Sequence, residues 1–197
     1  MSQILFLRHG PTQWNEAGRI QGRTDVPLSE QGRVTVSQWR LDARFSGWRC
    51  YCSPLTRAHE TAMLMQLQPE ASVHALQEMD WGQWEGHTLA SLRALDPLAF
   101  TRNEDRGLDF RPPDGESPRD VRSRLRQWIE SLTDQDLPAI GVCHKGVLRA
   151  ALSLATDWDM TDDPPEKLRD GKAHLYRVHE GQLLVEELNI PLVSKQS

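Results

Sequence analysis

Cysteines, long apolar runs and an excess of positive charge are scarce or missing in this chain of 197 residues, and each excludes a class of protein. The three cysteines, Cys50, Cys52 and Cys143, form neither a zinc-ligand pattern nor a Cys-x-x-Cys redox pair. They lie in apolar, strand-like runs, so we expect buried free thiols in a reducing compartment and therefore a cytoplasmic protein. No apolar run approaches the length of a membrane span, and no charged segment followed by an apolar stretch indicates a signal peptide.

The net charge limits the kinds of molecule that the protein is expected to bind. A formal net charge of −5 argues against a nucleic-acid-binding protein, which usually has a basic surface. It is compatible with a small anionic substrate, because a local cluster of arginines can dominate the potential inside a cleft. His59 and Glu60 belong to no His-Glu-x-x-His motif, so a zinc hydrolase has little support. We expect no nucleic-acid and no membrane partner, and the oligomeric state stays open, with a homodimer among the alternatives.

Strand-like apolar runs and helical periodicities alternate along the chain. The expected strands are residues 3–7, 48–52, 72–75 and 139–143, followed by a terminal hairpin of residues 173–178 and 182–188. The expected helices are residues 29–41, 54–67, 88–95, 117–132 and 146–155, and residues 101–116 are expected to be irregular. This order predicts an α/β fold with crossover connections, in one domain of residues 1–197 with a small lid-like segment at residues 87–116.

Reactive side chains follow the ends of four expected strands. They are Arg8 and His9 after the first, Arg57 after the second, Glu78 after the third and His144 after the fourth. Taken singly, each side chain is more often a surface, capping or core residue than a catalyst. In open α/β sheets, however, the chemistry gathers at the carboxyl ends of the strands. Their joint placement therefore predicts one site.

These residue types suit phosphoryl transfer. A neutral imidazole such as His9 can attack a phosphate ester without charge repulsion, and water can later cleave the phosphohistidine. Arg8 and Arg57 can bind the phosphoryl oxygens by bidentate hydrogen bonds. A protonated His144 would add a third cationic donor, and the helix that starts behind it would add backbone amides. Glu78 is the strand-end carboxyl group suited to protonating the leaving oxygen.

Several segments, in order along the chain, resemble the histidine phosphatase superfamily, which includes the phosphoglycerate mutases. They are residues 5–15 around Arg8-His9-Gly10, residues 21–22 and 25–32, residues 53–62 around Arg57, residues 78–86, residues 113–117 and residues 142–147 around His144. Matches spread over most of the chain make the resemblance specific. The chain departs from the family pattern at Pro11-Thr12, where an acidic residue and then a hydroxyl are common, and at Lys145, where many members have glycine.

The resemblance implies a three-layer αβα sandwich with a mixed, mostly parallel sheet and one reversed edge strand. It also implies a role for each matched residue: His9 as the nucleophile, Arg8, Arg57 and His144 as the phosphate pocket, Glu78 as the proton donor, Asn15 as a phosphate contact, and Gln21 with Gly22 at the substrate entrance. No metal and no organic cofactor are expected.

Within this resemblance, a metal-independent phosphomonoesterase for a small phosphorylated metabolite is favoured over a phosphoglycerate mutase. A mutase must hold a second anionic group, and such relatives carry a basic pair in an insertion after the acid. Here the corresponding stretch has no lysine and only four separate arginines, Arg93, Arg102, Arg106 and Arg111. The Trp-Gly-x-Trp-Glu-Gly pattern looks more like the monophosphatases, which include the α-ribazole phosphatases. A phosphatase for protein phosphohistidine or phosphotyrosine is a second alternative, and a non-catalytic binding module is disfavoured.

Some side chains have two readings at this point. Lys145 adds charge to the phosphate pocket or points to solvent. Trp81, Trp84 and Phe100 line a pocket for an organic leaving group or pack in the core and lid, and packing is favoured. The six acidic residues between positions 157 and 170 are expected to form a solvated surface.

Overall fold

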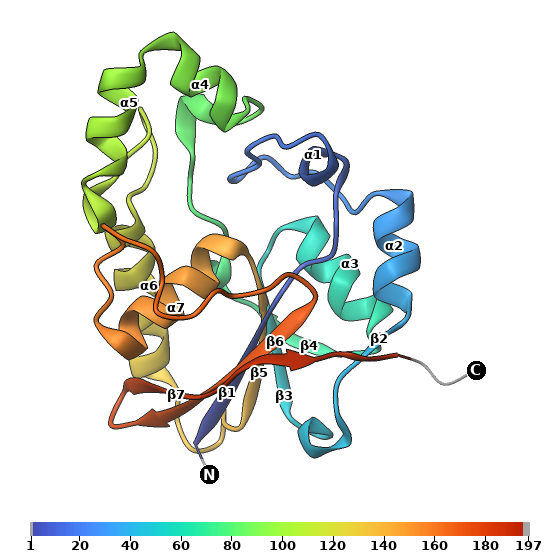
Figure 1. Cartoon of the computed structure of the whole chain (residues 1–197). Coiled ribbons are helices and arrows are strands. Elements are labelled where there is room, and N and C mark those ends of the chain that lie inside the picture. Colours follow the sequence, from blue (N-terminus) through green and yellow to red (C-terminus); the bar gives the residue numbers. More distant parts are fainter. Residues whose placement is uncertain (1, 195–197) are drawn as a thin grey trace.

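A computed structural model describes residues 2–194, and its central element is a mixed sheet of six strands (Figure 1). The strands follow the order β4-β3-β5-β1-β6-β7 across the sheet. Their bounds are β1 (Gln3–Arg8), β3 (Arg49–Cys52), β4 (Pro69–Ser72), β5 (Ala139–Cys143), β6 (Lys172–His179) and β7 (Gln182–Pro191). Two short strands, β2 (Trp39–Arg40) and β8 (Val193–Ser194), pair with each other outside this sheet.

The strands β1, β3, β4 and β5 are parallel, as the alternation of strands and helices predicts. β6 runs antiparallel to both of its neighbours, β1 and β7. The reversed strand therefore lies inside the sheet, and the expectation of a reversed edge strand is wrong. The cause is the predicted hairpin, in which Glu180 and Gly181 turn the chain at φ values of 49° and 73°. The outer strand β7 then returns in the direction of β1.

Seven α-helices lie within the described residues: α1 (Gln13–Glu16), α2 (Glu30–Ser37), α3 (Thr56–Leu64), α4 (Leu89–Leu95), α5 (Pro97–Glu104), α6 (Pro118–Ser131) and α7 (Lys145–Thr156). Ser29 and Ser117 are the N-caps of α2 and α6, as predicted. The Ser29 hydroxyl accepts from the Gly32 amide at 2.9 Å, and the Ser117 hydroxyl accepts from the Asp120 amide at 3.2 Å. These bonds satisfy amides that a helix start leaves without a partner.

Two expected boundaries are wrong because tertiary contacts decide them. α2 ends at Ser37 rather than at residue 41, since the chain leaves the helix so that β2 can pair with β8. The third parallel strand, β4, lies at residues 69–72 rather than 72–75. The following residues, His74–Leu76, form a 3-10 turn, which places Leu76 in the core with no exposed surface.

Part of the segment expected to be irregular is helical. Asp96 caps α5 by accepting from the Ala99 amide at 3.0 Å, and Pro97 occupies the first turn, where the missing amide hydrogen costs little. In Figure 1, α4 and α5 stand apart from the helices that cover the sheet. The lid role of residues 87–116, like the assignment of the chain to one domain, stays a prediction.

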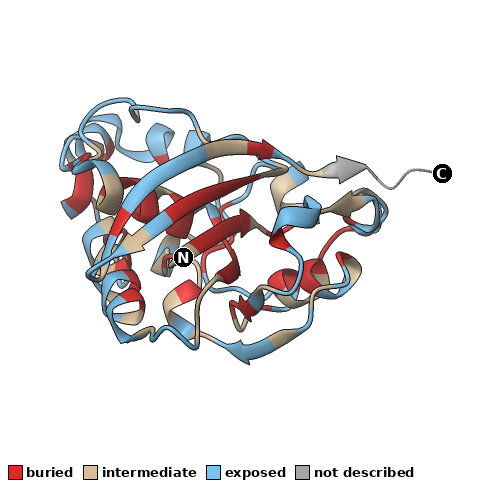
Figure 2. Ribbon diagram, turned by 90° about the horizontal axis from the view of Figure 1, so that it is seen from below, coloured by how far each residue is buried: buried red, intermediate tan, exposed pale blue. Residues whose placement is uncertain are grey.

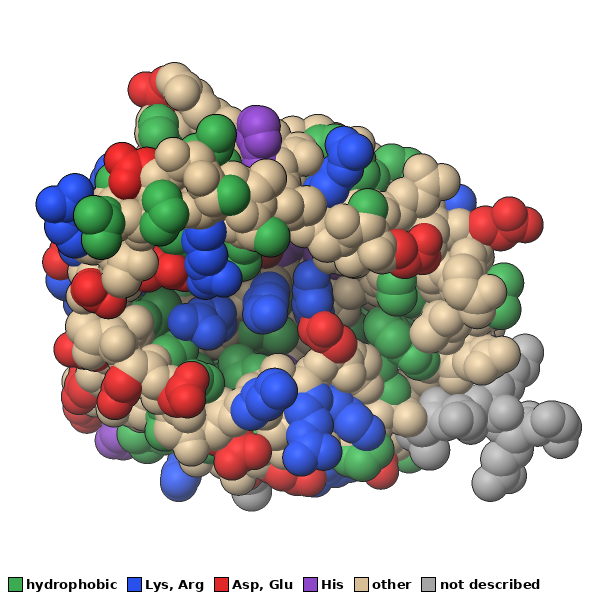
Figure 3. All heavy atoms as spheres, turned by 45° about the horizontal axis from the view of Figure 1, so that its top comes forward, with side chains coloured by type: hydrophobic (Ala, Val, Ile, Leu, Met, Phe, Trp, Pro, Cys, Tyr) green, Lys and Arg blue, Asp and Glu red, His purple; other side chains and the backbone are tan. Residues whose placement is uncertain are grey.

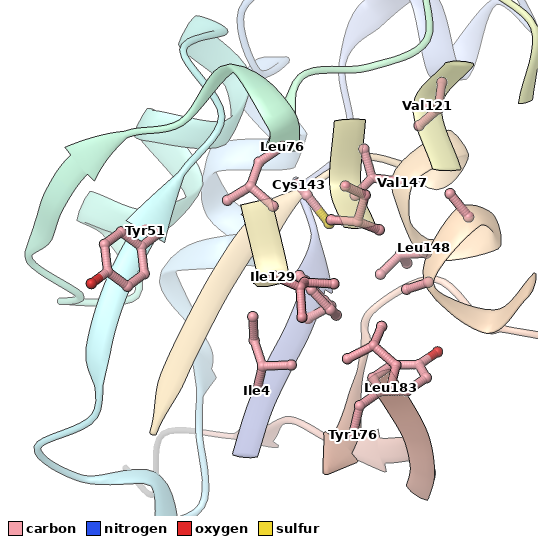
Figure 4. Packing of buried hydrophobic residues seen from close by; sticks show 14 of the residues in the cluster. Ile4, Tyr51, Leu76, Val121, Ile129, Cys143, Val147, Leu148, Tyr176 and Leu183 are labelled. Carbon is pink, nitrogen blue, oxygen red and sulfur yellow. The ribbon is translucent and has the colours of Figure 1, made fainter. Parts of the chain in front are cut away.

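Alternate side chains of β1 face opposite sides of the sheet. Ile4 and Phe6 pack in a cluster with side chains of α6 and α7, some of which are shown in Figure 4. Leu5 and Leu7 pack in a second cluster with side chains of α2 and α3. Figure 2 shows the inner strands buried and β7 largely exposed. The predicted three-layer αβα sandwich is confirmed.

Two compositional predictions can be compared with the described residues. The three cysteines are buried and unpaired, as the apolar runs around them predict. Burial raises the pKa of the Cys143 thiol well above its ordinary value, so this thiol stays protonated. Between residues 2 and 194, no helix combines the length and the apolar character that crossing a bilayer requires.

Candidate active site

His9 lies directly after β1. Its amide donates to the carbonyl oxygen of Cys143 at 2.9 Å, which continues the pairing of β1 with β5. The ring Nδ1 lies 2.6 Å from the carbonyl oxygen of Gly10, which can only accept, so Nδ1 carries the proton. Burial, and then the charges of Arg8 and Arg57, hold the pKa of His9 well below its ordinary value. The imidazole is therefore neutral at pH 7 and has its lone pair on Nε2.

Gly10 allows the turn that carries His9 to pack between two helices. A Cβ atom at this position would lie 2.1 Å from Cγ2 of Val36 in α2. The Gly10 amide donates to Oγ1 of Thr61 in α3, at 2.9 Å. The position of the imidazole is thus tied to α2 and α3.

Two guanidinium groups flank the imidazole. Arg57 in α3 is fully buried and donates to the carbonyl oxygens of Gly22 (2.7 Å) and Thr24 (3.0 Å). Arg8 at the end of β1 donates to Oδ1 of Asp170 at 2.6 Å. The acidic run that contains Asp170 is therefore not only the solvated surface that the sequence predicts. Nε of both arginines is buried without a partner, so each guanidinium keeps an unused donor.

A carboxylate organises the loop that holds Arg57. Glu85 accepts from the backbone amides of Arg23 (2.7 Å) and Thr24 (2.9 Å) and from the Thr24 hydroxyl. Gly22 adopts a φ of +53°, and a Cβ atom there would lie 1.9 Å from Oε1 of Glu85. The loop of residues 22–24 folds around the Glu85 carboxylate, and the carbonyl oxygens of Gly22 and Thr24 accept from Arg57.

His144 is the N-cap residue of α7, and its ring centroid lies 5.0 Å from that of His9. Nε2 lies 2.7 Å from Oγ of Ser53, and Nδ1 is buried without a partner. Burial, and then the neighbouring His9 and arginines, hold the pKa of His144 well below its ordinary value. The ring is therefore expected to be neutral when no anion is bound, and the role of a protonated His144 as a third cationic donor stays a prediction.

Glu78 contacts the N-terminus of α7. Its Oε1 accepts from the amides of Met79 (2.9 Å) and Gly146 (3.0 Å). Gly146 makes room for this contact, because a Cβ atom there would lie 2.3 Å from the same oxygen. Burial raises the pKa of Glu78 in spite of the opposing Met79 hydrogen bond and the nearby arginines. The carboxyl group therefore stays protonated to a higher pH than an exposed glutamate.

Arg124 of α6 fixes the segment that carries Glu78. Its guanidinium donates to the carbonyl oxygens of Ala75 (2.7 Å), Gln77 (2.8 Å) and Glu78 itself (3.2 Å). It also pairs with Oε2 of Glu116 at 3.2 Å. Several bonds in different directions suit the planar fork of arginine, and lysine cannot reproduce them.

These groups open into one cavity of about 620 Å³. Eight of the residues predicted for the site line it: Arg8, His9, Asn15, Gln21, Gly22, Arg57, Glu78 and Lys145. The ninth, His144, packs against His9 but does not line the cavity. Lys145 lines the cavity and is also exposed to solvent, so its contact with the phosphate stays a prediction. Figure 3 shows the hollowed face and the basic side chains gathered around it.

Comparison with known proteins assigns the family. A model of the histidine phosphatase superfamily (branch 1) matches residues 4–191. The chain belongs to this superfamily. The 2,3-bisphosphoglycerate-dependent phosphoglycerate mutase 2 of Gloeobacter violaceus is 35% identical over 150 residues. The glucosyl-3-phosphoglycerate phosphatase of Mycobacterium tuberculosis is 32% identical over 168 residues.

The extent of these matches differs between the relatives. The match to the mutase covers 68% of this chain but only 65% of the mutase, so the chain spans less than two thirds of that relative. The match to the phosphatase covers 78% of this chain and 74% of the phosphatase. The solved structure of YhfR from Bacillus stearothermophilus superimposes with a TM-score of 0.81 at 28% identity, covering 96% of this chain and 98% of YhfR. The expected phosphoglycerate mutase-like fold is thereby confirmed.

Thr12, which keeps the hydroxyl of the superfamily pattern next to Pro11, connects two predicted binding residues. Its buried hydroxyl accepts from the Asn15 amide (3.1 Å) and donates to Oε1 of Gln21 (2.9 Å). The Thr12 amide in turn donates to Oδ1 of Asn15 at 3.1 Å. Thr12 thus supports the wall of the cavity that Asn15 and Gln21 form.

The aromatic side chains near the cavity divide between the two alternatives. Trp84 stacks on the buried Phe100 with ring centroids 5.1 Å apart, so packing is confirmed for this pair. Trp81 lines the cavity and contacts Phe110, which also lines it, with ring centroids 5.5 Å apart. Sequence reasoning missed Phe110, which lies within a polar stretch.

Basic residues reach the cavity from an unexpected direction. The four arginines between residues 86 and 111 do not line it. Arg19 and Arg149 do, and sequence reasoning missed both. Helical spacing was an available signal for Arg149, because it follows Lys145 by one turn of the helix that begins after His144.

Proposed function

We propose that the protein is a phosphomonoesterase that acts on a small phosphorylated metabolite through a phosphohistidine intermediate. The observation that carries this proposal is the state of His9. Its imidazole is neutral, its Nδ1 proton is committed to a carbonyl oxygen, and two guanidinium groups lie close by. Such a ring offers Nε2 as a nucleophile beside fixed positive charge. Membership of the superfamily and a phosphatase relative support the assignment.

In the first step, Nε2 of His9 attacks phosphorus, so that the P–N bond forms and the P–O ester bond breaks. Glu78 gives its proton to the leaving oxygen, a role for which its raised pKa suits it. Arg8 and Arg57 balance the charge of the phosphoryl oxygens. In the second step, water attacks phosphorus, Glu78 takes a proton from this water, and the P–N bond breaks to release inorganic phosphate.

The other predicted residues complete the pocket in this proposal. His144 and Asn15 contact the phosphoryl group, and Gln21, Gly22 and Lys145 border the entrance. The reaction needs no metal or organic cofactor, because the guanidinium groups supply the positive charge that metal ions provide in many other phosphatases. The protein acts in the cytoplasm, which its buried and unpaired thiols support.

A phosphoglycerate mutase is the main alternative, and the mutase relative favours it. A mutase must hold a second anionic group of its substrate. The sequence argument against a mutase is the missing basic pair between residues 86 and 111. None of the four arginines there lines the cavity, so a second anionic group would have to meet the other cations that line it, Arg19, Lys145 and Arg149.

Phosphate release from a panel of monoesters, without added metal and with a chelator present, tests the proposal. The panel includes 3-phosphoglycerate and α-ribazole phosphate. Release from one or a few esters supports a phosphatase. Interconversion of 3- and 2-phosphoglycerate without release would establish a mutase, and inhibition by the chelator that zinc or magnesium reverses would overturn the metal-free reaction.

His9→Ala is expected to abolish turnover and to leave the melting temperature nearly unchanged. His179→Ala, at the exposed tip of the β6–β7 hairpin, is the matched control and should keep the parental rate. Acid-labile, alkali-stable labelling from a labelled ester should appear in the parent and be missing in His9→Ala. Residual activity within about tenfold of the parent would contradict the nucleophile assignment.

A further inference from the structure

Three basic side chains line the cavity beyond the two arginines of the phosphate pocket. Lys145 and Arg149 project from α7, and Arg19 approaches from the loop after α1. Within residues 2–194, none of the three forms an ion pair or a side-chain hydrogen bond. Arg8 and Arg57, by contrast, are already held by protein oxygens.

Arg149 is held in place without a counter-ion. Its guanidinium lies over the ring of Trp158, 4.7 Å from the centroid. Trp158 is itself fixed, because its indole Nε1 donates to Oδ1 of Asp162 (3.1 Å) and its backbone carbonyl oxygen accepts from Oγ of Ser153 (2.6 Å). Burial lowers the pKa of Arg149, and no carboxylate opposes this effect. A partly buried charge without a partner is costly, which is typical of a group that meets a ligand.

The acidic side chains of the cavity do not neutralise this cluster. Three of them line it: Glu78, Glu104 and Asp105. Glu78 binds backbone amides at the start of α7, and Glu104 pairs with Arg93 at 2.5 Å. Asp105 is exposed, and its single negative charge compares with the three positive charges of Arg19, Lys145 and Arg149. The part of the cavity beyond the phosphate pocket therefore carries net positive charge.

The helix fixes the distance between this cluster and the phosphate pocket. Lys145 and Arg149 are four residues apart and so lie on one face of α7. Arg149 is five residues beyond His144, which corresponds to about 7.5 Å along the helix axis. Since His144 packs against His9, one small molecule can place a phosphoryl group at His9 and a second group near Arg149.

We propose that Lys145 and Arg149, with Arg19 at the mouth, bind a second anionic group of the substrate. The substrate is then a phosphomonoester that also carries a carboxylate or a further phosphate. Trp81 and Phe110 supply an apolar wall for the carbon atoms between the two charged ends. This inference rests on the proposed function only for the reaction at the first phosphate, because anion binding by the cluster does not require turnover.

Binding of non-hydrolysable phosphonates, measured by calorimetry, tests the cluster independently of turnover. We would compare 4-phosphonobutyrate with butylphosphonate, and 6-phosphonohexanoate with hexylphosphonate. The two lengths bracket the spacing set by α7. The parent protein should bind the carboxylated member of at least one pair about 10- to 100-fold more tightly, the range given by hydrogen bonds between charged groups.

Substitutions then assign the preference to the cluster. Arg149→Gln and Lys145→Gln should each reduce the affinity ratio of the pair, and the double variant should bring it close to one. Lys145 is exposed, so Lys145→Gln should fold. Its affinity ratio can therefore be measured even if Arg149→Gln does not fold. Arg102→Gln is the matched control, because Arg102 is an exposed arginine outside the cavity and should leave the ratio unchanged.

The outcomes separate this inference from the proposed function. Equal affinity within both pairs, or a ratio that persists in the double variant, would overturn the inference even in an active phosphatase. A ratio that the double variant abolishes supports the second anionic site, even where no ester in the panel is hydrolysed. In that last case the site would stand and the phosphatase proposal would fail.

Discussion

Replacement of Glu85 by glutamine tests whether a carboxylate outside the cavity controls the phosphate pocket. Both carboxylate oxygens accept: Oε1 from the amide of Arg23 (2.7 Å) and Oε2 from the amide of Thr24 (2.9 Å). Glutamine has only one acceptor oxygen, and its amide group would face a donor. Loss of one charge-assisted hydrogen bond costs about 1.5–3 kcal/mol. For a chain of this length that corresponds to a melting temperature lower by about 3–12 °C.

The same substitution should reduce activity more than a general loss of stability explains. The loop around Glu85 provides the two carbonyl oxygens that hold Arg57, and a shift of about 1 Å in a positioning group can cost about 100-fold in rate. We expect kcat/KM for p-nitrophenyl phosphate to fall by about that factor, and inhibition by inorganic phosphate to weaken. Both are measured well below the melting temperature of the variant.

A matched control separates the effect of losing the Glu85 contacts from the effect of removing one negative charge. Glu70→Gln removes a carboxylate that pairs with Arg49 at the exposed edge of the sheet, far from the cavity. Exposed pairs contribute little, so this variant should keep parental stability and activity. If Glu85→Gln lost stability but kept its activity and its sensitivity to phosphate, the loop would not position Arg57 and the reasoning would be refuted.

Three further substitutions test the contacts of Asp170 and Arg124 and the burial of His174. Asp170→Asn should raise KM for p-nitrophenyl phosphate about two- to fivefold by loosening Arg8, and an unchanged KM at low salt would count against this contact. Arg124→Lys should slow esters with poor leaving groups more than p-nitrophenyl phosphate, because it releases the segment that carries Glu78; equal losses would contradict this. Burial lowers the pKa of His174 to about 4, so below pH 6.5 the unfolded chain binds a proton that the folded protein does not. Urea unfolding should therefore show about 2 kcal/mol less stability from this residue at pH 5 than at pH 7, and His174→Gln should remove that part of the pH dependence.

The gathering of the candidate site residues could be predicted because they sit at positions that local patterns define. Arg8 and His9 end one strand, and His144 ends another and caps the next helix. An apolar run followed by a polar residue marks such a position in the sequence. The parallel sheet then brings the strand ends together without any further information.

The supporting contacts could not be predicted, because they join segments far apart in the chain. Asp170 contacts Arg8 from a loop 162 residues later, and Arg124 reaches the segment of Glu78 from α6. No periodicity or spacing in the sequence indicates which residues Asp170 and Arg124 contact. Glu85 lies inside a recognisable motif, but only the structure shows that it shapes the loop around Arg57.

The two histidines of the site differ in how firmly their protons are fixed. Nδ1 of His9 faces a carbonyl oxygen, which can only accept, so the proton stays there and Nε2 keeps its lone pair. Nε2 of His144 faces the hydroxyl of Ser53, which can donate or accept, so this partner tolerates either protonation state. Burial, and after it the neighbouring positive charges, lower the pKa of both rings, and a phosphate dianion bound at the guanidinium groups would offset the part that these charges contribute. In the proposed reaction this charge favours a proton on His144, which could then donate to the phosphoryl group, while the carbonyl contact holds His9 in the tautomer that the proposed attack requires. The charge of the substrate would thus favour a donor at His144 and leave Nε2 of His9 available as the proposed nucleophile.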